Sequence, residues 1–283
     1  MSSPLRVWLS AGLLAAVLSF AAFAGGCAAG SSADESLGEV GGSSATDESG
    51  EAGGERVLEQ LPGYPHDAVP LYEVKLLDTV YYSVRNDPQW AIVEGGLRNF
   101  YHSVWESNVP AADVLAYYRD LCDEIDEDST FGEQLTGRIG VYDIFLNTGF
   151  HNDKNMAYLS VDLPRSTATE VNPFFEDYPK GLVELDGSFA VYEEQHYQTL
   201  FGINDVFYTR QFDIVDANGD GRPDYEGDAR LTYFEERYGD RTNFVLDSVY
   251  GSARWTDGEY NVVVAFSGDG SRGALTIGYD LAD

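Results

Sequence analysis

The body of this chain repeats its own residue pattern once, and that repetition constrains the fold more than any other feature. Three blocks recur in the same order at slowly rising offsets, which chance rarely produces. The matching blocks are Tyr64-Pro65, Val69 and Leu71 with Tyr178-Pro179, Val183 and Leu185; Leu115, Tyr117 and Tyr118 with Leu231, Tyr233 and Phe234; and Gly140, Tyr142, Ile144, Leu146, Leu159, Asp162 and Leu163 with Gly258, Tyr260, Val262, Val264, Ile277, Asp280 and Leu281. We therefore expect two related units, 61–172 and 173–283.

Each unit is predicted to contain two strands, one helix and two further strands. In the first unit, alternation predicts strands over 79–84, 99–105, 141–147 and 157–163. Apolar residues at helical spacing predict a helix between them, and they are Val114, Leu115, Tyr118, Leu121, Cys122 and Ile125. In the second unit, we expect a strand over 206–212, a helix over 228–238 and a hairpin formed by 260–266 and 274–279. This order predicts an α+β fold with antiparallel sheet.

One stretch has residue types and spacing that together indicate a chemistry. In Asp216-Ala217-Asn218-Gly219-Asp220-Gly221-Arg222-Pro223-Asp224, oxygen-bearing side chains stand at loop positions 1, 3, 5 and 9, and a glycine stands at position 6. Calcium takes six to eight oxygen ligands, and a glycine permits the sharp turn that aims them inward. The predicted ligands are the side chains of Asp216, Asn218, Asp220 and Asp224 and the carbonyl oxygen of Arg222.

Over these nine residues the loop resembles the D-x-N-x-D-G-x-x-D calcium loops of dockerins, integrin-type propeller blades and EF-hands. The resemblance implies a bound calcium ion. An EF-hand has a bidentate Glu at position 12, whereas Gly227 stands there in this chain, between Glu226 and Asp228. The other interpretation is an acidic turn that binds no metal, because Asn, Asp and Gly also favour tight turns.

The first 26 residues are typical of an export signal. Arg6 is followed by an apolar run to Phe23, and small residues lead to Cys27. Ala24-Gly25-Gly26-Cys27 resembles a bacterial lipobox, which implies that Cys27 is lipidated and that the protein is anchored in the bacterial cell envelope, outside the cytoplasm. The alternative is cleavage after Ala22-Phe23-Ala24, which would give a secreted protein.

Residues 27–60 are predicted to be a disordered tether. The stretch consists mostly of Gly, Ser, Ala, Asp and Glu, which cannot bury enough apolar surface to offset the entropy of ordering. We expect it to hold the folded body away from the membrane.

The charge of the chain excludes several classes of partner. The chain has 17 Lys and Arg against 48 Asp and Glu, a net charge of −31. Nucleic acid and anionic lipid surfaces require basic residues to neutralise phosphate, so we expect neither as a partner. Membrane contact is expected only through the lipid anchor.

The remaining reactive side chains give weaker signals. With Cys27 lipidated, Cys122 is expected to be a small buried hydrophobic residue. His66, His102, His151 and His196 lack any metal-ligand spacing, and His151 and His196 are expected on the surface. Glu193 and Glu194 are adjacent, so on a strand they point to opposite faces and do not form a catalytic pair. Trp90, Trp105 and Trp255 are better explained as core than as a sugar-stacking platform.

These observations favour a non-enzymatic binding or cell-envelope protein with one structural calcium ion. Its partner would be an envelope protein or a glycan that the sequence does not identify. The alternative function is an exported hydrolase acting on glycan or peptide, whose catalytic carboxylates the sequence does not reveal.

Overall fold

A computed structural model describes residues 58–84, 97–127, 130, 132–151, 153–164, 172–199 and 206–279 of the chain. Leu58–Asp283 form one compact unit. Cys27, the export signal and most of the predicted tether lie outside the described residues. Of the helices described, none is both long enough and apolar enough to cross a membrane.

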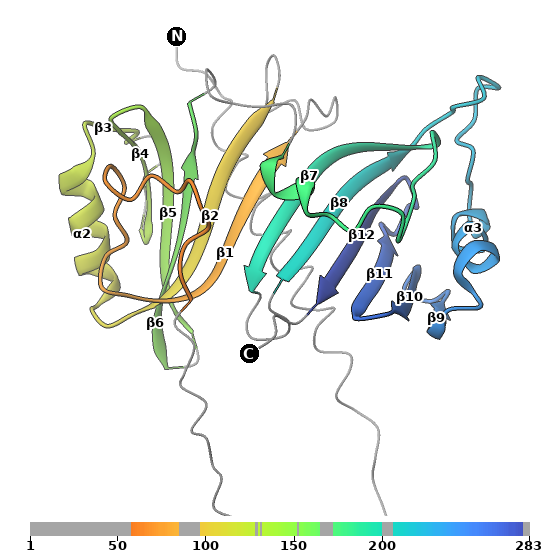
Figure 1. Cartoon of the computed structure of the whole chain (residues 1–283). Coiled ribbons are helices and arrows are strands. Elements are labelled where there is room, and N and C mark those ends of the chain that lie inside the picture. The colour runs from red at the N-terminus through yellow and green to blue at the C-terminus, as the bar shows by residue number, and fades with distance from the viewer. Residues whose placement is uncertain are drawn as a thin grey trace, which may run out of the picture. The chain divides into compact units, whose positions relative to one another are not determined.

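The described chain forms one antiparallel sheet of 12 strands, in the order β3-β4-β5-β6-β2-β1-β7-β8-β12-β11-β10-β9 (Figure 1). The strands are β1 Val74–Val84, β2 Arg98–Ser107, β3 Glu124–Ile125, β4 Gln134–Ile139, β5 Tyr142–His151, β6 Lys154–Asp162, β7 Phe189–Thr199, β8 Val206–Ile214, β9 Thr242–Asp247, β10 Ser252–Asp257, β11 Tyr260–Phe266 and β12 Arg272–Tyr279. The helical elements are α2 Ala111–Leu121, α3 Ala229–Tyr238 and the short 3₁₀ turn η3 Pro173–Glu176.

The predicted α+β fold class is wrong, because the structure is a β-rich fold. Four strands follow each α-helix instead of two: β3 to β6 follow α2, and β9 to β12 follow α3. β3, β4, β9 and β10 were not expected from the sequence. These are short, polar strands at the two ends of the sheet. β3 and β9 are the edge strands, and their residues are exposed or half-buried. Ile125 was also placed wrongly, since α2 ends at Leu121 and Ile125 belongs to β3.

The two halves of the sheet nevertheless have the same strand order. Reading outward from the central β1–β7 pair, the first half runs β1-β2-β6-β5-β4-β3 and the second runs β7-β8-β12-β11-β10-β9. Tyr142 pairs with Ile139 at the start of β5, and Tyr260 pairs with Asp257 at the start of β11. Tyr142 and Tyr260 therefore occupy corresponding positions in one continuous sheet.

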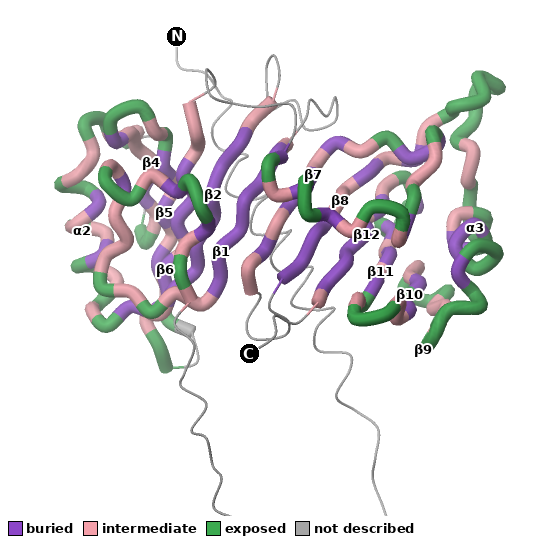
Figure 2. The backbone as a smooth tube through the Cα atoms, in the orientation of Figure 1, coloured by how far each residue is buried: buried purple, intermediate pink, exposed green. Residues whose placement is uncertain are grey.

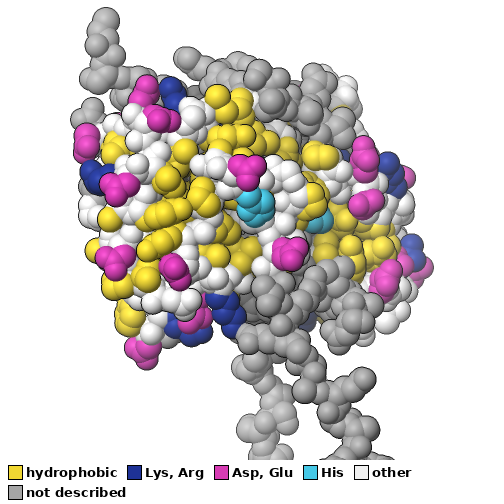
Figure 3. Space-filling view, turned by 60° about the vertical axis from the view of Figure 1, so that its left-hand side comes forward, with side chains coloured by type: hydrophobic (Ala, Val, Ile, Leu, Met, Phe, Trp, Pro, Cys, Tyr) yellow, Lys and Arg dark blue, Asp and Glu magenta, His cyan; other side chains and the backbone are white. Residues whose placement is uncertain are grey.

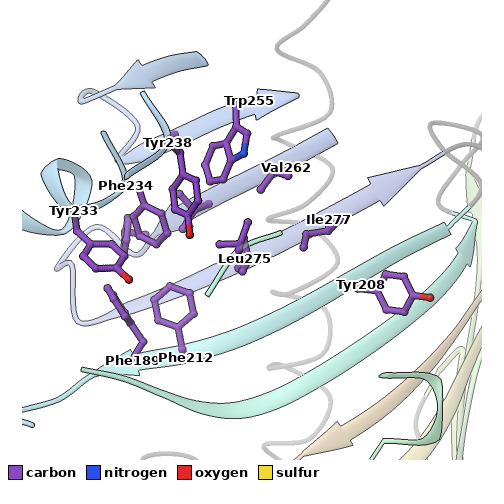
Figure 4. Packing of buried hydrophobic residues seen from close by; sticks show 14 of the residues in the cluster. Phe189, Tyr208, Phe212, Tyr233, Phe234, Tyr238, Trp255, Val262, Leu275 and Ile277 are labelled. Carbon is purple, nitrogen blue, oxygen red and sulfur yellow. The ribbon is translucent and has the colours of Figure 1, made fainter. Parts of the chain in front are cut away.

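Both helices pack on the same face of the sheet, which we call the helix face. α2 lies on β4, β5 and β6, and α3 lies on β9 and β10. On the helix face of the first half, the Tyr118 ring lies 6.3 Å from that of Trp105. In the second half, Phe234 and Tyr238 pack against Trp255, the Tyr238 and Trp255 rings being stacked at 4.7 Å (Figure 4). Two separate hydrophobic clusters result, one under each helix.

The opposite face of the central strands is buried as well, as the run of purple along β1 and β2 in Figure 2 illustrates. Its side chains include Val80, Tyr82, His102, Gln195 and Tyr197. The Tyr197 hydroxyl donates to Gln195 Oε1 at 2.6 Å and lies 3.5 Å from the Tyr82 hydroxyl. Since successive side chains of a strand alternate between faces, this hydroxyl and amide cluster is separated by the sheet from the residues beneath the helices.

Candidate functional site

The predicted calcium loop connects β8 to α3. β8 ends at Ile214 and α3 begins at Ala229. The loop is tied to the segment before β7: Val215 N donates to Ser188 O at 2.9 Å, and the Ser188 hydroxyl donates to Asp224 Oδ2 at 2.7 Å. Asp224 N also donates to Val215 O at 3.2 Å, which closes the loop at its base. The loop therefore has a defined attachment to the sheet.

Inside the loop, the Asp216 carboxylate organises the backbone. Its Oδ1 accepts from Gly219 N at 2.6 Å and from Asp220 N at 3.0 Å, and its Oδ2 accepts from Gly221 N at 2.6 Å. Gly219 and Gly221 have φ of 78° and 87°, a region that residues with a Cβ rarely adopt. The glycines at these positions therefore allow the chain to wrap around the Asp216 carboxylate.

The structure brings only some of the predicted ligands together. Asn218 Nδ2 lies 2.5 Å from Asp224 Oδ1, and Asp220 Oδ1 accepts from Arg222 N at 3.0 Å. In the described part of the chain, no group of three or more His, Cys, Asp or Glu side chains is arranged to hold a metal ion. Two of the five predicted ligand oxygens do not come from Asp or Glu side chains. They are the amide oxygen of Asn218 and the backbone carbonyl oxygen of Arg222. Its donor chemistry suits a hard cation such as calcium.

A second cluster of polar residues lies on the helix face, where the two halves of the sheet meet. Asn99 of β2, Ser83 of β1, Glu194 of β7 and Arg210 of β8 are neighbours across four adjacent strands. We call these four residues the junction row. Arg210 Nη2 lies 3.2 Å from Glu194 Oε1, and the two side chains are 26% and 8% exposed. The row runs across the four central strands, from the first half of the sheet to the second.

Aromatic rings surround the junction row. The next set of cross-strand neighbours is Tyr101, Tyr81, His196 and Tyr208. From η3, Phe174 stacks on His196 at 4.7 Å, and the guanidinium of Arg210 lies 5.5 Å from the centre of the Tyr178 ring. Asn172 holds η3 in place, since its Nδ2 donates to Glu194 O at 3.3 Å and its Oδ1 accepts from Phe174 N at 3.1 Å.

Several atoms of this cluster are buried without a hydrogen-bond partner. They are Ser83 Oγ, Asn99 Oδ1, Arg210 Nε and His196 Nδ1. A buried polar atom left unsatisfied costs about 1–3 kcal/mol, and such atoms are rare enough in folded proteins to require an explanation. Burial also lowers the pKa of His196 from 6.5 to about 4, partly offset by the charge of Asp177, so His196 is neutral at pH 7.

Two further titratable groups are buried on the opposite face. Asp78 is 3% exposed, and burial raises the pKa of its carboxyl well above the usual range. His102 is 4% exposed, and burial lowers its pKa to about 4. His102 Nδ1 lies 3.0 Å from Ser160 Oγ, whereas His102 Nε2 and Asp78 Oδ1 have no hydrogen-bond partner.

The other sequence-based expectations have mixed outcomes. Glu193 and Glu194 do point to opposite faces: Gln195 Nε2 donates to Glu193 on the face of Tyr197, whereas Glu194 meets Arg210 on the helix face. Trp105 and Trp255 are buried core residues, 0% and 2% exposed, as expected. Trp90 lies outside the described residues.

The expectation of a surface His196 is wrong, because this ring is half-buried beneath Phe174. The side chain of His151 lies outside the described residues. Cys122 is half-buried just after the end of α2, and burial raises the pKa of its thiol. It is less buried than expected, because α2 ends one residue before it.

The junction row was not expected from the sequence. Its one visible signal was the run Glu193-Glu194-Gln195-His196, in which charged and polar residues persist on both faces of a strand. A strand whose two faces are both polar is unusual in the middle of a sheet, because central strands are normally apolar on at least one face. On the face shown in Figure 3, Asp and Glu side chains outnumber Lys and Arg side chains.

No protein-family model, curated protein or solved structure matches this chain.

Proposed function

We propose that this protein is a non-enzymatic binding or cell-envelope protein, lipid-anchored through Cys27 outside the bacterial cytoplasm, with a structural calcium ion in the loop from Asp216 to Asp224. The observation that supports the calcium site is the wrapping of the loop backbone around the Asp216 carboxylate, with Gly219 and Gly221 at positive φ. In this conformation the backbone turns around the side chain of the first predicted ligand, Asp216.

A calcium ion would act on the folded state through the attachments of the loop. Asp224 is hydrogen-bonded to Ser188, directly before β7. Tyr225, next to it, stacks on Phe189 at 5.1 Å and donates to Asp186 Oδ2 at 3.1 Å. Three aspartates on a nine-residue loop repel one another, and a divalent cation would remove that repulsion. The ion would thereby fix the start of β7 as well as the loop.

The role of the ion would be structural. Extracellular calcium modules bind at about 10⁻⁴ to 10⁻³ M, and this loop lacks an acidic residue at position 12. At a hundredfold excess over Kd, binding stabilises the folded state by about 2.7 kcal/mol. For a folded body of this size, that corresponds to a rise in melting temperature of about 5 to 10 °C.

The test is the melting temperature of the full chain in 10 mM calcium and in chelator. The wild type is expected to melt higher in calcium, and Asp220→Ala is expected to lose that difference. Asp240→Ala is the matched control, because Asp240 is an exposed acid after α3 and outside the loop. Equal melting temperatures of the wild type in the two buffers would show that the loop is only an acidic turn.

A further inference from the structure

We propose that the junction row is a binding site for a neutral, hydroxyl-rich ligand of the saccharide class. The inference rests on the proposed role as a binding protein and is independent of the calcium loop. It is motivated by Ser83 and Asn99, which are both 1% exposed and each have a side-chain oxygen without a hydrogen-bond partner.

The unsatisfied atoms require a ligand that both donates and accepts hydrogen bonds. Asn99 Oδ1 is an acceptor, Arg210 Nε is a donor, and the Ser83 hydroxyl is both. A hydroxyl group offers a donor and two acceptor positions. A molecule with several adjacent hydroxyls therefore matches this mixture, whereas an ionised carboxylate offers only acceptors and an ammonium only donors.

The charges at the site also favour a neutral ligand. Glu194 and Arg210 form an ion pair across β7 and β8 at 3.2 Å, so the row carries no net charge. An anion approaching Arg210 would be repelled by the Glu194 carboxylate, and a cation approaching Glu194 would be repelled by the guanidinium. The net charge of −31 further disfavours anions.

Aromatic rings provide the remaining contacts. Phe174 of η3 lies against His196 and Tyr81, which neighbour the row, and Tyr178 lies against Arg210 of the row. Aromatic rings can pack against the apolar C–H groups of a saccharide ring, while neighbouring polar side chains bind its hydroxyls. Arg210, His196 and Phe174 are half-buried, whereas Ser83 and Asn99 are fully buried. We therefore place the entry of the ligand beside Arg210, the most exposed member of the row.

The experiment measures binding of free saccharides to the full chain by saturation-transfer NMR and calorimetry. The probes are glucose, galactose, mannose, N-acetylglucosamine and their disaccharides, with inorganic phosphate and spermidine as charged probes. At least one saccharide is expected to bind, and Ser83→Ala and Arg210→Lys are expected to weaken it tenfold or more. Ser160→Ala is the matched control, because Ser160 is a buried serine on the opposite face, bonded to His102.

Three results would overturn the proposal: no saccharide binding to folded wild type, binding unchanged in Ser83→Ala, or tighter binding of phosphate or spermidine than of any saccharide. If Arg210→Lys does not fold, Ser83→Ala decides alone, since it removes only a hydroxyl without a partner. Each titration is repeated in calcium and in chelator. If the chain binds a saccharide and has the same melting temperature in calcium and in chelator, the calcium site is rejected and this inference is supported.

Discussion

Acid should destabilise this protein through His102, and the size of the effect follows from the structure. The imidazole is 4% exposed on the opposite face of β2, and burial lowers its pKa from 6.5 to about 4. Because the pKa is lower in the folded state, the unfolded chain binds the proton more readily. The contribution of neutral His102 to the stability of the folded state is therefore complete above pH 6.5. It is lost as the pH falls from 6.5 towards 4.

Replacing His102 by Asn should remove this loss. With pKa values of 6.5 unfolded and about 4 folded, linkage gives a loss of about 2 kcal/mol at pH 5 and about 3 kcal/mol at pH 4. An Asn amide can keep a hydrogen bond to Ser160, which now meets His102 Nδ1 at 3.0 Å. The variant is expected to be less stable than wild type at pH 7.5, because the smaller side chain leaves a cavity. Near pH 4 its free energy of unfolding should equal or exceed that of wild type.

The assay is urea unfolding of wild type and His102→Asn at pH 7.5, 6, 5 and 4. Asp78 and His196 also titrate in this range or beyond it, but both proteins contain them, so their contributions cancel in the difference. His66→Asn is the matched control, because His66 is exposed. A constant difference between wild type and His102→Asn from pH 7.5 to pH 4 would refute the reasoning.

Three further predictions concern the buried carboxyl, the core and the anchor. Burial raises the pKa of Asp78 above 3.8, so ionisation of this carboxyl destabilises the folded state as the pH rises. The melting temperature of Asp78→Asn relative to that of wild type should therefore increase between pH 4 and pH 7. A difference that does not change with pH would contradict this. Phe234→Ala should cost about 3–5 kcal/mol in urea unfolding, because the ring is fully buried under α3, whereas Val249→Ala at an 85% exposed position should stay within about 0.5 kcal/mol. Cys27→Ser should move the protein from the membrane fraction to the soluble fraction, and unchanged membrane association would reject the lipid anchor.

The elements with the clearest patterns could be predicted from the sequence. The α3 helix and the β11–β12 hairpin lie within a residue or two of their expected bounds, because helical spacing and strict alternation each specify one buried face. β4 and β10 could not be recognised. β4 reads QLTGRI and β10 reads SARWTD, and such short, mixed sequences form strands only because a neighbouring strand pairs with them.

The junction row could not be predicted, because its members come from four strands far apart in sequence. Ser83 faces Glu194 only through the β1–β7 pairing, which contains a register shift between Thr79 and Val80. A shift of one residue would have placed Ser83 on the opposite face. By contrast, the predicted ligands of the calcium loop lie within nine residues of the sequence, so their spacing is visible without any knowledge of the sheet.

The calcium loop occurs in only one half of the sheet, and this restricts what the ion would do. In the first half, β2 is followed after Asn108-Val109-Pro110 by α2, whose Tyr118 hydroxyl donates to Pro70 O at 2.8 Å. In the second half, the Tyr233 hydroxyl of α3 donates to Glu184 O at 3.3 Å, again in the segment before the first strand of that half.

In both halves, therefore, a tyrosine hydroxyl of the helix donates to a backbone carbonyl oxygen in the segment before the first strand. The first half does this without a long loop between strand and helix, so this contact does not require the proposed metal. What the loop adds is its attachment to Ser188 and Asp186 at the start of β7. Since β7 begins with Phe189, which pairs with Ile214 of β8 and belongs to the hydrophobic cluster beneath α3, loss of the proposed calcium ion should loosen this end of that cluster before it affects the cluster beneath α2.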